Sequence, residues 1–263
     1  TVKGMCGKSE ETANLQDLLI YTLKGLAVYA EKAKELGISD KKDGLFVAQA
    51  LFNTITNANF DNDRIIELIK ETLNHREALK EKFLAAYKEK NGRDFEETLH
   101  HSATWFSDDE TEFHDKAKSV GVLATENEDV RSLRELLVIG VKGIAAYADH
   151  AAVLGFEKDE IYDFFMESLA STTKDLSVDD MIALVLKAGE VAVTTMATLD
   201  EAKAIRLAQA QGERTQADQA IAQSLPPLVQ LLSPGDGDTF DQAQLTLRYR
   251  IKNPTGSPIG KLK

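Results

Sequence analysis

Cys6 is the only cysteine in the 263-residue chain, and it stands in the run Gly4-Met5-Cys6-Gly7-Lys8, ahead of the first predicted helix. A lone cysteine is commonly a small buried hydrophobic residue. Here the flanking glycines and the lack of apolar neighbours beyond Met5 favour a thiolate ligand for a metal or an iron–sulfur cluster. One thiolate cannot hold such a cofactor, so the sequence indicates a site that Cys6 alone does not complete.

Two further groups of residues could carry chemistry. His100 and His101 lie near the carboxylates of Asp108-Asp109-Glu110 and near His114. Adjacent histidines point to opposite sides of most backbones, and no spacing here matches a known ligand pattern, so a solvated loop is the favoured interpretation. The acidic clusters are typical of solvated surface and helix caps. The sequence contains no nucleophile elbow, no phosphate-binding glycine loop and no His-Glu metal helix.

Composition limits the classes of partner. The net charge of −12 disfavours nucleic acid and anionic membranes, which both require a basic face. No uninterrupted apolar run reaches the 18 residues of a membrane span, and no signal segment is visible, so we expect a cytoplasmic protein without a membrane partner. All five prolines lie after residue 225, and residues 201–263 carry a net charge of +2. An acidic, proline-free body is therefore joined to a tail of different composition.

The body contains an internal duplication. Residues 15–37 align without gaps on residues 133–155, at an offset of 118, with eleven of 23 positions identical. Apolar residues recur at helical spacing in both copies, and Gly37 and Gly155 fit the left-handed position that ends helices. The identical positions include the pairs Lys24/Lys142 and Gly25/Gly143. Because glycine costs about 1 kcal/mol inside a helix, the glycine pair predicts a close helix crossing in each copy.

Two more helices follow each copy, which predicts a three-helix bundle used twice. The predicted helices span residues 45–57 and 63–90 after the first copy, and begin at Glu160 and Ser177 after the second. The fold class is therefore mainly α: two consecutive three-helix bundles, followed by a short, truncated β tail. The expected layout is a first bundle with an N-terminal iron–sulfur loop (1–90), a polar connector anchored by Trp105 and Phe106 (91–130), a second bundle (131–200), a helical extension (201–223) and an incomplete β-strand tail (224–263).

The tail has the period-two pattern of strands at residues 245–251, with turn residues on either side. Two or three strands cannot bury a core by themselves. The tail therefore resembles the opening of a bacterial immunoglobulin-like module.

Five runs of sequence resemble the hybrid cluster protein family, also called the prismane or hydroxylamine reductase family. They span residues 1–25, 54–61, 124–137, 170–180 and 196–202, so the resemblance extends over about the first 200 residues. The resemblance implies an N-terminal domain of two three-helix bundles. It also implies a 4Fe-4S cluster bound by four cysteines, of which Cys6 matches the fourth and is the one ligand present here.

The resemblance implies an iron–sulfur oxidoreductase that reduces hydroxylamine to ammonia, is linked to nitric oxide and nitrosative stress, and requires an electron donor. In that family a hybrid iron–sulfur–oxygen cluster in later α/β domains performs the reduction, and its ligands have no counterpart here. From residue 203 the chain departs from the family pattern, so we expect it to be inactive by itself. The alternative is a non-enzymatic helical scaffold fused to an immunoglobulin-like interaction module.

Overall fold

The computed structural model describes residues 7–39, 41–55, 59–210, 228–233 and 246–252. The chain divides into two compact units, Thr1–Leu199 and Asp200–Lys263. Within the described residues of the first unit, all regular structure is helical. Its elements are α1 (Glu10–Glu35), α2 (Lys41–Asn53), α3 (Asn62–Asn91), α4 (His101–Thr104), α5 (Glu110–Val120), the 3₁₀ turn η1 (Val122–Ala124), α6 (Glu128–Val153), α7 (Asp159–Ser171) and α8 (Val178–Ala210), which continues into the second unit.

The long helices begin and end at local sequence signals. The Ser9 hydroxyl accepts a hydrogen bond from the Thr12 amide at 3.0 Å and starts α1, and the Asn127 side chain caps α6 in the same way. The helices α1 and α6 are followed by Gly37 (φ 77°) and Gly155 (φ 89°), which confirms the predicted left-handed ends. At the start of α8, the Asp180 amide donates to the Ser177 hydroxyl at 3.1 Å, which confirms the predicted cap.

The helix bounds keep the offset of the sequence duplication. Both α6 and α7 begin and end 118 residues after α1 and α2. The third pair is less regular, because α8 begins 116 residues after α3. The arrangement of the six helices as two separate bundles stays a prediction, since α1 packs against α3 and also α7, while α2 packs mainly against α6 and α7.

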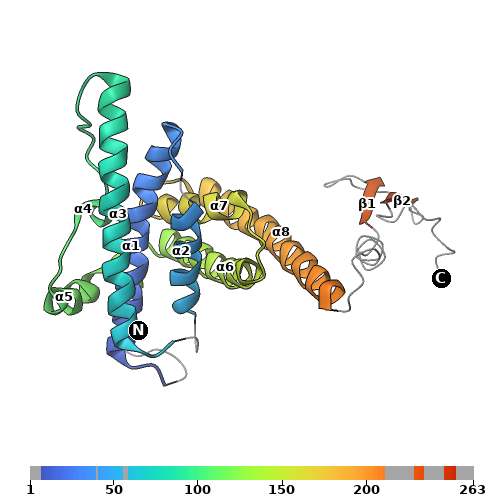
Figure 1. The fold of residues 1–263 in the computed structure, drawn as a ribbon, viewed down its shortest axis with the longest axis horizontal. Helices are drawn as coiled ribbons and strands as arrows, with labels where there is room; N and C mark the ends of the chain where they lie inside the picture. The colour runs from blue at the N-terminus through green and yellow to red at the C-terminus, as the bar shows by residue number, and fades with distance from the viewer. Residues whose placement is uncertain (1–6, 40, 56–58, 211–227, 234–245, 253–263) are drawn as a thin grey trace. The chain divides into compact units, whose positions relative to one another are not determined.

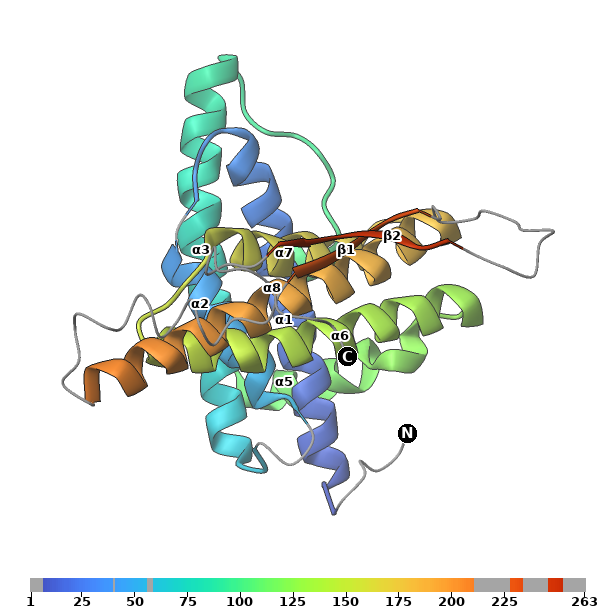
Figure 2. The same cartoon turned by 90° about the vertical axis from the view of Figure 1, so that its right-hand side faces the viewer.

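Figure 1 shows α1 and α3 running side by side, with α6 and α7 crossing them, and Figure 2 shows the same crossing from the side. The helix α1 is buried on most sides because other helices pack around it. Gly44 in α2 allows a close approach to α7: a β-carbon on Gly44 would lie 2.5 Å from the β-carbon of Tyr162. One continuous apolar core therefore joins both halves of the unit.

The segment 91–130 is not the solvated loop that we expected. It contains α4, α5 and η1, and both helices pack on α1. Phe113 in α5 is fully buried and lies against Trp105, whereas Phe106 is 48% exposed. The anchor of this segment is therefore Trp105 together with Phe113, and the expectation for Phe106 was wrong. Short helices of this kind are stabilised by the surface on which they pack, which local sequence does not reveal.

The predicted close crossing at the paired glycines is present in the first copy. A β-carbon on Gly25 would lie 2.0 Å from the carbonyl oxygen of Ser102. For Gly143, no atom of the described chain lies within 4 Å of such a β-carbon. The close approach at Gly25 comes from α4, and the residues at the equivalent offset, 219–222, lie outside the described residues, so the crossing at Gly143 stays a prediction.

Two helices carry long apolar faces that the unit leaves exposed. By length and composition alone, Glu128–Val153 and Val178–Leu207 could cross a membrane, with mean hydropathies of 1.4 and 1.5 in their most apolar windows. Neither helix contains an uninterrupted apolar run of that length, because charged residues such as Lys142 divide the apolar stretches. Much of this apolar surface is open: Ile139 in α6 is 64% exposed and Leu186 in α8 is 67% exposed.

The described strands of the second unit form an antiparallel pair. Strand β1 (Leu228–Ser233) pairs with β2 (Arg248–Lys252), with Val229 opposite Ile251 and an irregularity between Leu231 and Ser233. The predicted strand at 245–251 is thus present from Arg248. The immunoglobulin-like assignment stays a prediction, because most of residues 224–263 lie outside the described residues, as does the second half of the helical extension 201–223.

Candidate functional site

The predicted ligand Cys6 lies outside the described residues, and the structure begins at the next position. Gly7 has the left-handed φ of 82° that favours glycine. The ammonium group of Lys8 donates to the side-chain oxygen of Gln16 at 2.5 Å, so the chain is tied to α1 two residues after the cysteine. The role of Cys6 as a cluster ligand therefore stays a prediction.

The two adjacent histidines have separate structural contacts. The ring of His100 caps α4, with Nδ1 accepting from the Ser102 amide at 3.2 Å. Nδ1 of His101 lies 2.6 Å from the Tyr21 hydroxyl and 3.2 Å from the Lys116 ammonium. Burial lowers the pKa of His100, which keeps its ring neutral at pH 7. Each histidine thus joins α4 to its surroundings, and within the described residues no group of three His, Cys, Asp or Glu side chains could hold a metal ion.

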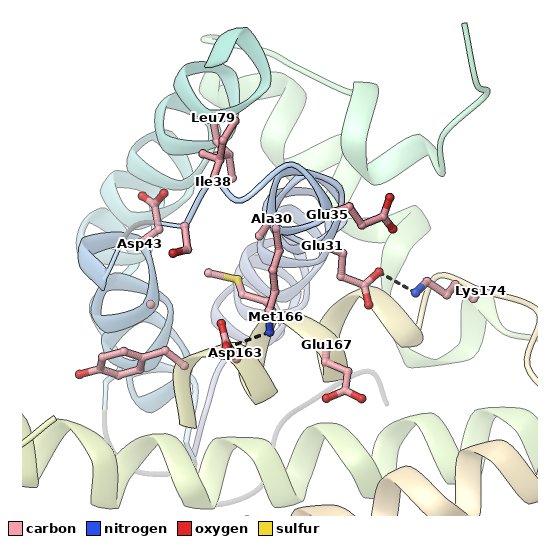
Figure 3. A pocket seen from close by; sticks show the side chains of 14 residues that line it. Ala30, Glu31, Glu35, Ile38, Asp43, Leu79, Asp163, Met166, Glu167 and Lys174 are labelled. Carbon is pink, nitrogen blue, oxygen red and sulfur yellow. Dashed lines mark hydrogen bonds and ion pairs between the residues drawn. The ribbon is translucent and has the colours of Figure 1, made fainter. Parts of the chain in front are cut away.

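One cavity of the first unit, of about 540 Å³, lies where the end of α1 meets α2 and α7 (Figure 3). Its charged side chains are mostly paired with one another. Lys174 donates to Glu31 at 2.6 Å, a pair marked in Figure 3, and Lys34 donates to Asp163 at 2.8 Å. These pairs join α1, in the first copy of the duplication, to α7 and the residues after it, in the second copy. They leave few polar groups free to bind a ligand. We therefore interpret this cavity as a gap between packed helices and not as a binding site.

A second cavity, of about 350 Å³, differs because its charged lining groups form no ion pairs within the described residues. It lies between α1 and α6 and is closed by residues of α4, α5 and η1. We call it the charge-lined cavity. Its charged and imidazole lining groups are Asp17, Lys24, His100, His101, Lys116, Arg134 and Glu135.

The duplication places equivalent charges on both sides of the charge-lined cavity. Asp17 and Lys24 of α1 correspond, at the offset of 118, to Glu135 and Lys142 of α6. The seven-residue spacing puts the acid and the lysine on the same face of each helix. All four side chains are partly buried, and none makes a hydrogen bond or ion pair within the described part of the chain. They do interact electrostatically, since Lys142 and Lys24 lie close enough to stabilise the Asp17 carboxylate.

Burial controls the protonation of this group. It raises the pKa of Asp17 to about 6, although Lys142 and Lys24 act in the opposite direction. Burial lowers the pKa of Lys24 and of Lys142, while Asp17 and Glu135 oppose that shift. Perturbed pKa values of this kind in a cavity are typical of functional sites, and they also occur in structural ion networks.

One more polar group at the cavity is unsatisfied. Nε of Arg134 is buried without a hydrogen-bond partner among the described residues. The other nitrogens of its guanidinium group are used: one donates to the carbonyl of Lys174 at 2.8 Å and one to the Thr125 hydroxyl at 3.5 Å. A buried N–H without an acceptor costs about 1–3 kcal/mol.

The charge-lined cavity was not predicted from the sequence. The identity of Lys24 and Lys142 was visible there, but no role followed from it. The available signal was the acid-to-lysine spacing repeated in both copies, Asp17 to Lys24 and Glu135 to Lys142. The facing of α1 and α6 across a cavity could not be read from either copy alone.

Comparison with known proteins supplies the family. The sequence model of the Prismane/CO dehydrogenase family matches residues 1–226, which extends beyond the resemblance found up to residue 202. Curated relatives include proteins named hydroxylamine reductase from Nitratidesulfovibrio vulgaris (67% identical over 202 residues), Halothermothrix orenii (58% over 203) and Desulfosudis oleivorans (55% over 204). Each alignment covers 77% of this chain and 36–37% of the relative. The chain thus spans just over a third of the length of these relatives, and it belongs to the Prismane/CO dehydrogenase family.

Proposed function

We propose that this chain is the helical N-terminal part of a hydroxylamine reductase, an iron–sulfur oxidoreductase. The observation that carries the proposal is the 67% identity over 202 residues to a relative named hydroxylamine reductase. The overall reaction consumes one hydroxylamine, two electrons and two protons, and yields ammonia and water. The partners are a redox electron donor and a small nitrogenous substrate, the role is linked to nitric oxide and nitrosative stress, and the location is the cytoplasm.

Within this proposal, Cys6 supplies one thiolate to a 4Fe-4S cluster. Thiolates are soft, anionic donors that suit iron–sulfur clusters, which take four such ligands. The chain contains one cysteine, so its own residues do not fit a whole cluster. The ligands of the hybrid cluster are likewise proposed to lie in parts of the relatives that this chain does not match. We therefore assign no reaction step to the residues of this chain.

The exposed apolar faces of α6 and α8 support the proposal that this chain is one part of a larger protein, in which further polypeptide contacts these faces. Ile139, Leu186 and Val193 are each more than 60% exposed. Large apolar patches on a protein surface commonly mark interaction sites. The relatives contain almost two thirds of their length beyond the matched region, which is enough chain to cover these faces.

Anaerobic reconstitution of the chain with iron and sulfide tests the role of Cys6. We expect weak iron–sulfur charge-transfer absorption, with less than one cluster per chain, that is lost in Cys6→Ser. The variant His150→Gln, which alters an exposed residue of α6, should retain it. Equal absorption in Cys6→Ser would refute the ligand assignment. Ammonia formation from hydroxylamine by the reconstituted chain with a reduced dye would refute the expectation that it is inactive alone.

A non-enzymatic scaffold is the second candidate. The pairing of β1 with β2, both beyond residues 1–226 that the family model matches, is the observation that favours it. In that case the second unit would be an interaction module joined to the helical unit. Iron–sulfur absorption that disappears in Cys6→Ser would argue against a purely structural role, whereas complete absence of bound iron in the wild-type chain would favour it.

A further inference from the structure

The charge-lined cavity has a surplus of cationic groups. Lys24, Lys116 and Arg134 line it, against the carboxylates of Asp17 and Glu135. These three cations and two carboxylates together carry a net charge of +1 when both acids are ionised. Lys142 stands close to the acids and adds a further positive charge to the surroundings.

Unpaired charges are costly in a partly buried site. An ammonium or guanidinium group that loses water without gaining an acceptor is destabilised, and its surroundings favour any ligand that restores the lost hydrogen bonds. Lys24 makes no hydrogen bond within the described residues. The Arg134 guanidinium donates to the Lys174 carbonyl and the Thr125 hydroxyl but forms no ion pair within the described part of the chain. The missing component of the site is thus an acceptor of hydrogen bonds that carries negative charge.

We propose that the charge-lined cavity binds a small oxyanion through the Lys24 ammonium and the Arg134 guanidinium groups. A tetrahedral or planar oxyanion offers several acceptor atoms to such donors, and charge-assisted hydrogen bonds of this type are the strong ones. The cavity volume of about 350 Å³ also admits the water molecules that would remain around the anion. The proposal depends only on the residues of this cavity and is independent of the proposed reductase function.

Binding is coupled to the charge of Asp17. That carboxylate faces Lys24 on its own helix, Glu135 and Lys142 on α6, and the cavity itself. On the other walls are His100, which stays neutral, and the Lys116 ammonium. Protonation of Asp17 removes one negative charge beside the anion, so the oxyanion binds more tightly at pH 5 than at pH 8.

Sulfate is the probe for this site, because it stays a dianion across that pH range. Calorimetric titration of the full chain with sodium sulfate, at constant ionic strength, should show saturable binding to one site. Lys24→Met and Arg134→Met should each weaken binding at least about tenfold, because each removes a charge-assisted hydrogen bond. Lys187→Met is the control, since Lys187 pairs with Glu167 on the surface, and it should bind sulfate like the wild type.

The variant Asp17→Asn tests the coupling and covers the case in which a lysine variant does not fold. It should bind sulfate more tightly than the wild type at pH 8 and show little change between pH 5 and pH 8. Absence of saturable binding in the wild type at pH 5 would overturn the proposal. Equal weakening in Lys24→Met and Lys187→Met, or an Asp17→Asn variant that retains the wild-type pH dependence, would also overturn it.

Discussion

The backbone of Ser102 lies directly against Gly25, so closely that a β-carbon at position 25 would be 2.0 Å from the Ser102 carbonyl oxygen and 2.6 Å from its carbonyl carbon. The same carbonyl oxygen accepts a hydrogen bond from the Arg76 guanidinium at 2.9 Å. Gly25 of α1, which has no side chain, therefore allows α4 to approach closely, and the buried Arg76 of α3 binds α4 by a hydrogen bond. This relationship fixes the wall of the charge-lined cavity that carries His100 and His101.

Gly25→Ala should destabilise the first unit, because the added methyl group meets backbone atoms that cannot rotate away. We expect a loss of about 1–3 kcal/mol in the free energy of unfolding, measured by urea denaturation. Gly143→Ala is the matched control at the equivalent position of α6, where the described chain leaves open space. It should gain up to about 1 kcal/mol from the higher helix propensity of alanine. Equal effects of the two substitutions would contradict the asymmetric packing.

Arg76→Met should be strongly destabilising, because Arg76 is completely buried and binds three groups. Its guanidinium donates to the carbonyls of Ser102 and Trp105, at 2.9 and 2.6 Å, and to the carboxylate of Glu77 at 2.6 Å. Removing the cation leaves these acceptors without a donor, and breaking a buried ion pair typically costs about 3–5 kcal/mol.

The control for this substitution is Arg64→Met on the same helix. Arg64 forms exposed pairs with Glu67 and Glu71, so its loss should change the free energy of unfolding by less than about 1 kcal/mol. Hydrogen exchange supplies a second measurement: amides of residues 101–105 should exchange faster in Arg76→Met and remain protected in Arg64→Met. Unchanged exchange in Arg76→Met would show that the cation does not hold α4.

Local signals in the sequence were sufficient for most helix bounds but not for the segment between the two copies. Apolar spacing, N-caps and terminal glycines act within a few residues, so α3 and α7 begin within one residue of the predicted positions. The helices α1 and α6 end just before the predicted glycines but begin five residues ahead of the aligned copies. The helices α4 and α5 depend on contacts with α1, about 80–100 residues away in sequence, and no local pattern reveals such contacts. The charge-lined cavity was missed for the same reason, since its walls come from both copies.

The pKa of Asp17 predicts a specific pH dependence of stability. The carboxyl ionises near its ordinary value of 3.8 in the unfolded chain but at about 6 in the folded protein, because burial penalises the charge. Between these values the folded state binds more protons, so stability falls as the pH rises through this window. Asp17→Asn removes the penalty and should stabilise the protein above pH 6 by about 2 kcal/mol, with little effect near pH 3.5.

Asp109→Asn provides the contrast for this prediction. Hydrogen bonds from the Thr111 amide and hydroxyl lower the pKa of Asp109, which caps α5 at the surface. Its contribution therefore has the opposite sign: it is present above the ordinary pKa and is lost as the pH falls. Thermal unfolding curves from pH 3.5 to pH 8 distinguish the two, and a stabilising effect of Asp17→Asn that did not vary with pH would exclude burial of the carboxylate as its cause.

A polar substitution should strongly lower the free energy of unfolding on the buried side of α6 and hardly change it on the exposed side. Leu137 is fully buried in the core, whereas Ile139, two positions along, is 64% exposed. Leu137→Gln places an unsatisfied amide in the core and removes packing, so we expect a loss of more than about 3 kcal/mol. Ile139→Gln should change the free energy of unfolding by less than about 0.5 kcal/mol, as surface substitutions usually do.

Ile139→Gln should also reduce binding of a hydrophobic dye to the folded chain, because it interrupts the apolar face that α6 presents. A large loss of stability in Ile139→Gln would show that this face is covered in the isolated chain.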